Sequence, residues 1–181
     1  DQDVVWLEEL KEKGLVISKP NWPFLLEGDS REAELAGVWG GIVGSFWTMI
    51  VTFAIAFPIG VMAAIYLEEF APKNWFTDLI EVNINNLAAV PSIVFGLLGL
   101  AIFINLFGLA RSIPLVGGLV MALRMFPTIV IASRSALQAV PDSLTDSALS
   151  LGASRIQAVF NHKVTVAAPA MLTGALIRLA P

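Results

Sequence analysis

Long apolar stretches with at most one formal charge alternate with short polar segments along most of the chain. Residues 38–67 form an uncharged run of 30 residues, which as a helix would be about 45 Å long. A bilayer core needs only about 20 residues, so this run predicts a membrane-spanning helix that is tilted or bent. Apolar segments at 87–107, 115–132 and 164–181 predict three further spans. We therefore expect an all-α integral membrane protein with at least four spans.

The polar segments differ in character. Residues 68–86 alternate large apolar side chains with charged and amide side chains, a pattern typical of a helix on the membrane surface or at the junction between two spans. Residues 1–37 hold nine Asp/Glu against four Lys/Arg. We expect this acidic segment to lie outside the membrane, separate from a transmembrane domain over 38–181.

Composition and charge restrict the class of protein. With 56% hydrophobic and only 14% charged residues, the chain is too apolar for an ordinary soluble domain. A formal net charge of −4 argues against a nucleic-acid partner. The chain starts with Asp and stops within an apolar run, so we expect it to be a piece of a longer protein.

The residues that catalysis or metal binding would require are missing from the sequence. It has no Cys and a single histidine, His162, with no second metal ligand at helical spacing. The G-x-x-x-x-G-K-[ST] phosphate-binding motif is also absent. We therefore expect no cofactor, no metal site, no catalytic residue and no ATP hydrolysis by this chain.

A few polar side chains in or beside the predicted spans are candidates for contact with a solute. Arg124 lies inside the third span, where an arginine facing lipid costs about 2.5–3.5 kcal/mol, so it should face protein or water. Two interpretations remain open: an electropositive lining for an anion path, or a pair with an acid on another helix. Arg134, at the end of this span, either touches a passing anion or extends to the interface. Ser92, Gly96 and Gly99 predict a helix-packing seam, with Ser92 also a candidate for anion contact.

A polar, helix-prone segment at 140–163 separates the last two predicted spans. Pro141 opens it as a helix-start residue would. The tripeptide Asp146-Ser147-Ala148 is followed by Gly152, which can turn sharply between two short helices. The segment therefore predicts a helical hairpin that docks with a soluble partner.

At these residues the sequence resembles the EAA loop of ABC importer permeases, in which Glu-Ala-Ala is followed by three residues and Gly. Residues 66–99 resemble the matching region of PstA-like phosphate permeases, and the resemblance runs from about Gly40 to Gly174. The sequence departs from the family at the last span. Val164-Thr165 replaces the usual Leu-Pro, and Lys163 stands where the family is usually apolar.

The resemblance implies a type I ABC importer transmembrane domain in the bacterial inner membrane, with a cytoplasmic hairpin and a periplasmic segment at 1–37. The expected partners are an ABC ATPase subunit, a second permease subunit and a periplasmic phosphate-binding protein. The residues expected to couple to the ATPase are Asp146, Ser147, Ala148, Gly152 and Arg155. The candidates for the anion path are Arg124, Arg134 and Ser92, although the family usually has an apolar residue at position 124.

Other functions remain open at this stage. The chain could be the sister permease subunit, or a permease for another oxyanion. A membrane scaffold without an ATPase partner is a further alternative. One feature fits the expected orientation poorly: residues 68–86 carry one Lys against four acids, an unusual balance for a cytoplasmic loop.

Overall fold

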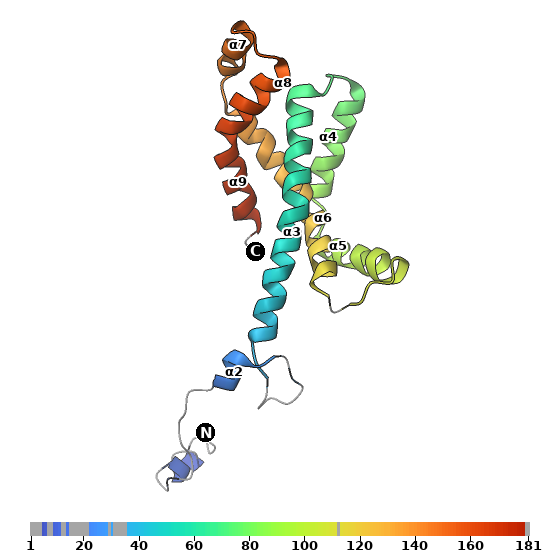
Figure 1. The fold of residues 1–181 in the computed structure, drawn as a ribbon. Coiled ribbons are helices and arrows are strands. Elements are labelled where there is room, and N and C mark those ends of the chain that lie inside the picture. Colours follow the sequence, from blue (N-terminus) through green and yellow to red (C-terminus); the bar gives the residue numbers. More distant parts are fainter. Residues whose placement is uncertain are drawn as a thin grey trace. The chain divides into compact units, whose positions relative to one another are not determined.

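A computed structural model describes residues 5–6, 9–11, 14, 22–28, 30, 36–111 and 113–179, and every regular element in them is helical (Figure 1). The chain divides into two units, residues 1–44 and 45–181, which are described separately. The expected all-α fold is confirmed for the described part of the chain.

The described part of the first unit centres on the short helix α2 (Trp22–Leu26). The amide of Val38 donates to the Phe24 carbonyl at 2.9 Å, and the amide of Gly37 donates to the Gly28 carbonyl at 2.8 Å. A Cβ at Gly37 would overlap the Glu27 carbonyl, so only glycine fits there. Most of the segment predicted at 1–37 lies outside the described residues.

Among the described residues, two helices are long and apolar enough to cross a membrane. The first is α3 (Trp39–Ile65), which passes directly into one π-helical turn, η1 (Tyr66–Phe70). The second is α6 (Pro114–Gln138). It continues well past the predicted boundary at 132 and contains the buried Pro127 within its length.

A third span would be made by a bent helix pair. Helix α4 (Trp75–Ala88) is followed by α5 (Ser92–Gly99) and η2 (Leu100–Leu106), and the two parts meet at 96°. The break lies at Pro91, the N-cap of α5, because proline has no amide to continue the helical hydrogen bonding. The boundary predicted between residues 86 and 87 therefore falls inside α4.

The rest of the chain forms a hairpin and a final helix. Helix α7 (Asp142–Ser150) precedes a turn, after which α8 (Arg155–Ala158), η3 (Val159–Val164) and α9 (Thr165–Leu179) follow without interruption. No break separates the predicted hairpin from the predicted last span. The 15 residues of α9 are about 22 Å long, less than a bilayer core requires.

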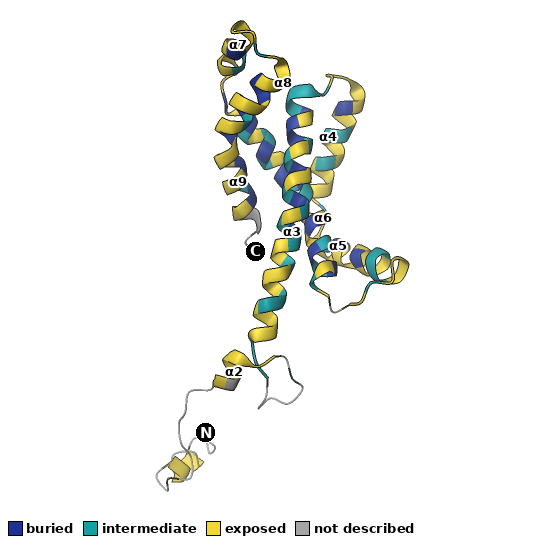
Figure 2. Cartoon of the chain, viewed as in Figure 1, coloured by how far each residue is buried: buried dark blue, intermediate teal, exposed yellow. Residues whose placement is uncertain are grey.

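Helix α6 lies at the centre of the second unit and packs against α4, α5 and α9. It also contacts α3, through Ala122, Met125 and Ile129 against Ala56. Small residues let the helices approach closely: a Cβ at Gly118 would lie 2.5 Å from Val51 Cγ1, and one at Gly60 would lie 2.7 Å from Ile129. Buried positions follow these contacts along the helices (Figure 2).

The packing seam predicted on α5 is formed at only one of its three residues. Gly99 lies against Val120 of α6, and a Cβ there would overlap that valine. A Cβ at Gly96 would meet nothing within 4 Å, and Ser92 is exposed. Only one of these three small residues therefore serves close packing within the chain, because α5 turns one face alone to α6.

Candidate functional site

The hairpin is built by local turn chemistry. Gly152 has a φ of 90°, a conformation that glycine adopts without a steric penalty, as the sequence predicted. Its amide donates to the Leu149 carbonyl at 2.9 Å. Ser154 then caps α8 by a capping box with Gln157, in which each side chain satisfies the other residue's amide.

The five predicted coupling residues do not share one surface. Asp146, Ser147 and Gly152 are exposed, and the Asp146 carboxylate has no ion pair among the described residues. Ala148 is only 5% exposed, so it packs inside the chain rather than facing a partner. Arg155 turns toward the end of α3: its Nη2 donates to the Glu69 carbonyl at 2.6 Å.

The base of the hairpin is tied to the end of α3 by a buried ion pair. Lys163 Nζ in η3 lies 2.7 Å from Glu69 Oε1 in η1, and the two side chains are 7% and 10% exposed. The same Nζ lies 2.8 Å from Asp142 Oδ1 at the start of α7. The Arg155 guanidinium lies 5.9 Å from the centre of the Phe70 ring, within the range of a cation–π contact.

The charged forms of Asp142 and Lys163 are both stabilised at the base of the hairpin. The hydrogen bond from Lys163, followed by its positive charge, lowers the pKa of Asp142 below its ordinary 3.8. Burial alone would lower the pKa of Lys163, but hydrogen bonds and charges from Asp142 and Glu69 outweigh it and raise this pKa above 10.5. Both groups are therefore ionised at neutral pH.

Glu68, the residue before Glu69 in η1, makes a second set of polar contacts. Its carboxylate accepts from Arg134 Nε at 3.1 Å and from Gln138 Nε2 at 3.1 Å, both on α6. Arg134 Nη2 also lies 2.9 Å from Glu81 Oε1 on α4. Two carboxylates thus neutralise the arginine that the sequence placed on an anion path.

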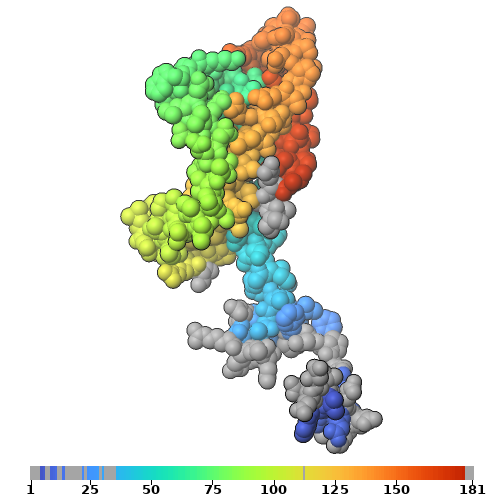
Figure 3. Space-filling model, turned by 180° about the vertical axis from the view of Figure 1, so that it is seen from behind, coloured from blue at the N-terminus to red at the C-terminus, as the bar shows by residue number. Residues whose placement is uncertain are grey.

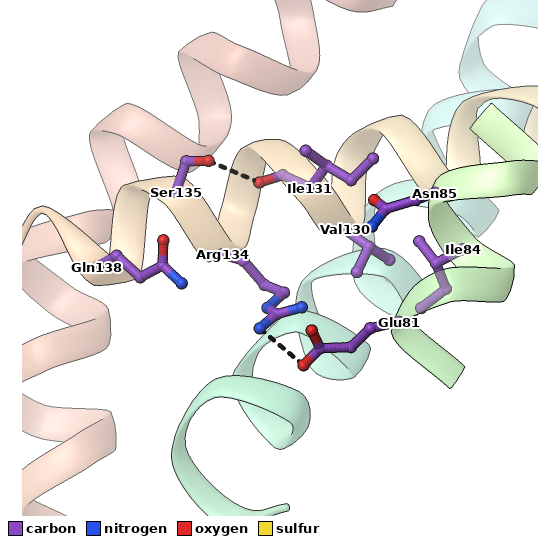
Figure 4. A pocket seen from close by; sticks show the side chains of 8 residues that line it. All are labelled: Glu81, Ile84, Asn85, Val130, Ile131, Arg134, Ser135 and Gln138. Carbon is purple, nitrogen blue, oxygen red and sulfur yellow. Dashed lines mark hydrogen bonds and ion pairs between the residues drawn. The ribbon is translucent and has the colours of Figure 1, made fainter. Parts of the chain in front are cut away.

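A pocket of about 190 Å³ lies between α4 and α6 at this point. These helices lie side by side when the molecule is seen from behind, α4 in green and α6 in orange (Figure 3). Figure 4 shows the Arg134 guanidinium turned toward Glu81 at the pocket wall. With this cation already paired, the pocket has no free positive charge for an anion. Its lining residues are Glu81, Ile84, Asn85, Val130, Ile131, Arg134, Ser135 and Gln138.

The other two anion-path candidates lie apart from Arg134. Arg124 is exposed on α6, about 15 Å along the helix from Arg134, and it forms no ion pair with another described residue. Ser92 is exposed at the start of α5. A second pocket, between α3, η2 and α6, has a wholly apolar lining. The three candidates therefore form no single site within the described chain.

Two features of the sequence indicated an ionic contact here, but neither identified the partners. Residues 68–86 have a large excess of acid, and Lys163 departs from the family pattern. The structure joins these observations, because three of the four acids in that segment pair with Arg134 and Lys163. The unusual charge balance of the loop is thus offset by cations that come from α6 and η3.

Comparison with known proteins places this architecture in a family. Residues 56–181 match the family described as "Binding-protein-dependent transport system inner membrane component". The chain is 34% identical over 163 residues to the probable ABC transporter permease protein YqgI of Bacillus subtilis, covering 89% of this chain and 54% of that protein. It is 30% identical over 159 residues to the phosphate transport system permease protein PstA of Mycobacterium leprae, covering 88% and 52%.

A solved structure shares the fold. The MetNI methionine ABC transporter, in inward-facing conformations, gives a TM-score of 0.59 at 20% identity, covering 79% of this chain and 66% of that one. The chain spans about half the length of the curated relatives that it matches. The predicted resemblance to PstA-like ABC permeases is confirmed, and the chain belongs to the binding-protein-dependent transport system inner membrane components.

Proposed function

We propose that the chain is part of the permease subunit of an ATP-driven, binding-protein-dependent phosphate importer. The observation that carries this proposal is the hairpin at 142–164, which presents exposed residues at its tip and is fastened to the membrane helices at its base. Leu151, 90% exposed, and the carboxylate of Asp146 offer an apolar and an acidic contact to an ATPase. Similarity to PstA of Mycobacterium leprae supports phosphate as the substrate.

The mechanism follows from how the hairpin is connected. Helix α6 leads into it, and α8, η3 and α9 leave it as one continuous run. When ATP binding closes the ATPase subunits, the docked hairpin moves with them. It carries along α6, which leads into it, and α9, which leaves it. The spans then rock between inward-open and outward-open states. ATP hydrolysis belongs to the separate ATPase subunit.

For the anion path, we propose Arg124 as the principal contact in this chain. It is exposed on a membrane-spanning helix, where a charge is stable only against protein or water. A second permease subunit completes the path on that side. Ser92 is a candidate at the exposed start of α5, whereas Arg134, held by Glu68 and Glu81, contributes only if those pairs open.

A substitution at Gly152 tests the coupling role. Gly152→Val forces a side chain into a left-handed conformation that costs about 1–2 kcal/mol, although there is open space around the site. In liposomes that contain the ATPase, the second permease and the binding protein, ATP hydrolysis should continue while phosphate uptake falls. Gly96→Ala, at an open helical position, is the matched control and should leave both rates unchanged. Normal uptake by the Gly152→Val transporter would refute the coupling model.

A further inference from the structure

We propose that the consecutive residues Glu68 and Glu69 form a clamp that passes the motion of the hairpin to α3. Glu68 holds α6, the helix that enters the hairpin, and Glu69 holds η3, which leaves it. The inference rests on the proposed function, because it concerns how the same hairpin moves the spans. Glu68, Glu69 and their partners are positioning residues that do not themselves touch the substrate.

Glu68 and Glu69 can reach different elements because they are neighbours on one helical turn, η1. The amide of Ala71 donates to the Tyr66 carbonyl at 2.7 Å, the five-residue hydrogen bond of a π-helix. Successive side chains on a helical turn, whether α or π, point roughly a quarter of a turn apart. One glutamate therefore faces α6 while the next faces the base of the hairpin.

The two halves of the clamp differ in burial. The Glu69 and Lys163 side chains are 10% and 7% exposed, whereas those of Glu68 and Arg134 are 19% and 22% exposed. Buried charges are screened less by salt, and loss of one partner leaves the other buried and unpaired. Loss of the Lys163–Glu69 pair should therefore weaken the clamp more than loss of the Glu68–Arg134 pair.

Lys163 also closes the hairpin on itself. Its second partner, Asp142, is the first residue of α7, so one ammonium group joins the start of the hairpin, its end and α3. The Arg155 bond to the Glu69 carbonyl fixes the same turn from α8. Because α3 is far from the hairpin along the chain, it is linked to the hairpin by these polar contacts and by the apolar cluster that contains Ile65, Val140 and Val159. Helix α6, in contrast, leads into the hairpin through a short backbone connection, and α9 continues directly from it.

The test measures phosphate uptake per ATP hydrolysed by the assembled transporter in liposomes. Lys163→Met should lower this ratio about 10-fold, within the range of typical coupling between sites, while hydrolysis continues. Lys163→Arg, which keeps the charge, should retain most of the ratio. Lys73→Met removes an exposed lysine from the turn before α4 and should change nothing. A wild-type ratio in Lys163→Met would overturn the clamp.

Cross-linking separates a role in transmission from a role in stability alone. The sequence has no cysteine, so Glu69→Cys with Lys163→Cys places a unique thiol pair in this chain. The ratio should be low in this variant, return when a reducible bifunctional thiol reagent joins the two cysteines, and fall again on reduction. A ratio that ignores cross-linking would overturn the clamp.

Two further outcomes are a Lys163→Met variant that fails to assemble and a wild-type transporter that shows no uptake. If Lys163→Met fails to assemble, Glu69→Gln with Lys163→Met leaves no unpaired charge between these two positions, and a wild-type ratio in that variant overturns the clamp. If the wild-type transporter shows no ATP-dependent uptake, the proposed function fails, and the clamp fails with it. Wild-type uptake with an unaltered ratio in the variants rejects the clamp alone.

Discussion

Lys163 Nζ lies 2.7 Å from Glu69 Oε1, and this buried ion pair joins the helix that leaves the hairpin to the π-helical end of α3. The residues are 94 positions apart in a chain of 181. The contact therefore belongs to the tertiary structure and links the candidate coupling element to the longest apolar helix.

Lys163→Met should destabilise the folded permease by about 3–5 kcal/mol, because it leaves the Glu69 carboxylate buried without its partner. Chemical denaturation in detergent micelles, followed by the helical circular dichroism signal, measures the loss. Lys73→Met serves as the matched control at an exposed lysine. Equal stability of the two variants would show that the pair contributes little.

Asp142 should make stability depend on pH in the acid range. Because the folded state lowers the pKa of this carboxyl below its ordinary 3.8, its contribution is present above 3.8 and is lost as the pH falls through the lowered pKa. Asp142→Asn should therefore flatten the acid side of the melting-temperature profile relative to the wild type. Superimposable profiles would contradict the proposed pairing with Lys163.

Lys163 should make stability depend on pH in the alkaline range. Its pKa is raised above 10.5, so its contribution is present below that pH and is lost as the pH rises through the raised pKa. Lys163→Met should remove this alkaline loss, whereas Lys73→Met should retain it. The same melting-temperature measurements, extended to alkaline pH, provide the comparison.

The elements with strong local signals could be predicted from the sequence, whereas the contacts between them could not. The uncharged run at 38–67 predicts α3, because burial in lipid restricts which residues fit. Gly152 predicts the turn of the hairpin, because a positive φ favours glycine. The boundary predicted between residues 86 and 87 lies a few residues before the break at Pro91, since the amphipathic pattern of α4 fades before the helix ends. The pairing of Glu68 with Arg134 leaves no periodic trace, because it joins residues 66 positions apart.

Adjacent glycines on α6 test the close packing of the spans. Gly118→Ala would place a Cβ 2.5 Å from Val51 Cγ1 and should cost about 1–3 kcal/mol through overpacking. Gly117→Ala would place one at an ordinary contact, 3.4 Å from Thr48 Cγ2, and should be nearly neutral. Thermal unfolding of the two variants measures the difference, and equal melting temperatures would show that the α3–α6 contact at Gly118 can adjust to a methyl group.

The two arginines of α6 should respond differently to the same substitution. Arg134→Gln leaves Glu68 and Glu81 without their cation and should lower the melting temperature. Arg124→Gln should leave stability nearly unchanged and reduce phosphate uptake, because this exposed side chain is the proposed contact with the anion. If Arg124→Gln transports normally, Arg124 is not on the path; if Arg134→Gln melts as the wild type does, its ion pairs contribute little.

ATP-dependent uptake of labelled phosphate, measured against sulfate and molybdate, tests the central claim most directly. The measurement uses the complete transporter in liposomes, with its ATPase, second permease and binding protein. We expect uptake of phosphate that requires ATP and is not matched by the other two anions. Uptake of sulfate or molybdate in its place would contradict the substrate, and the absence of any ATP-dependent uptake would contradict the proposed function itself.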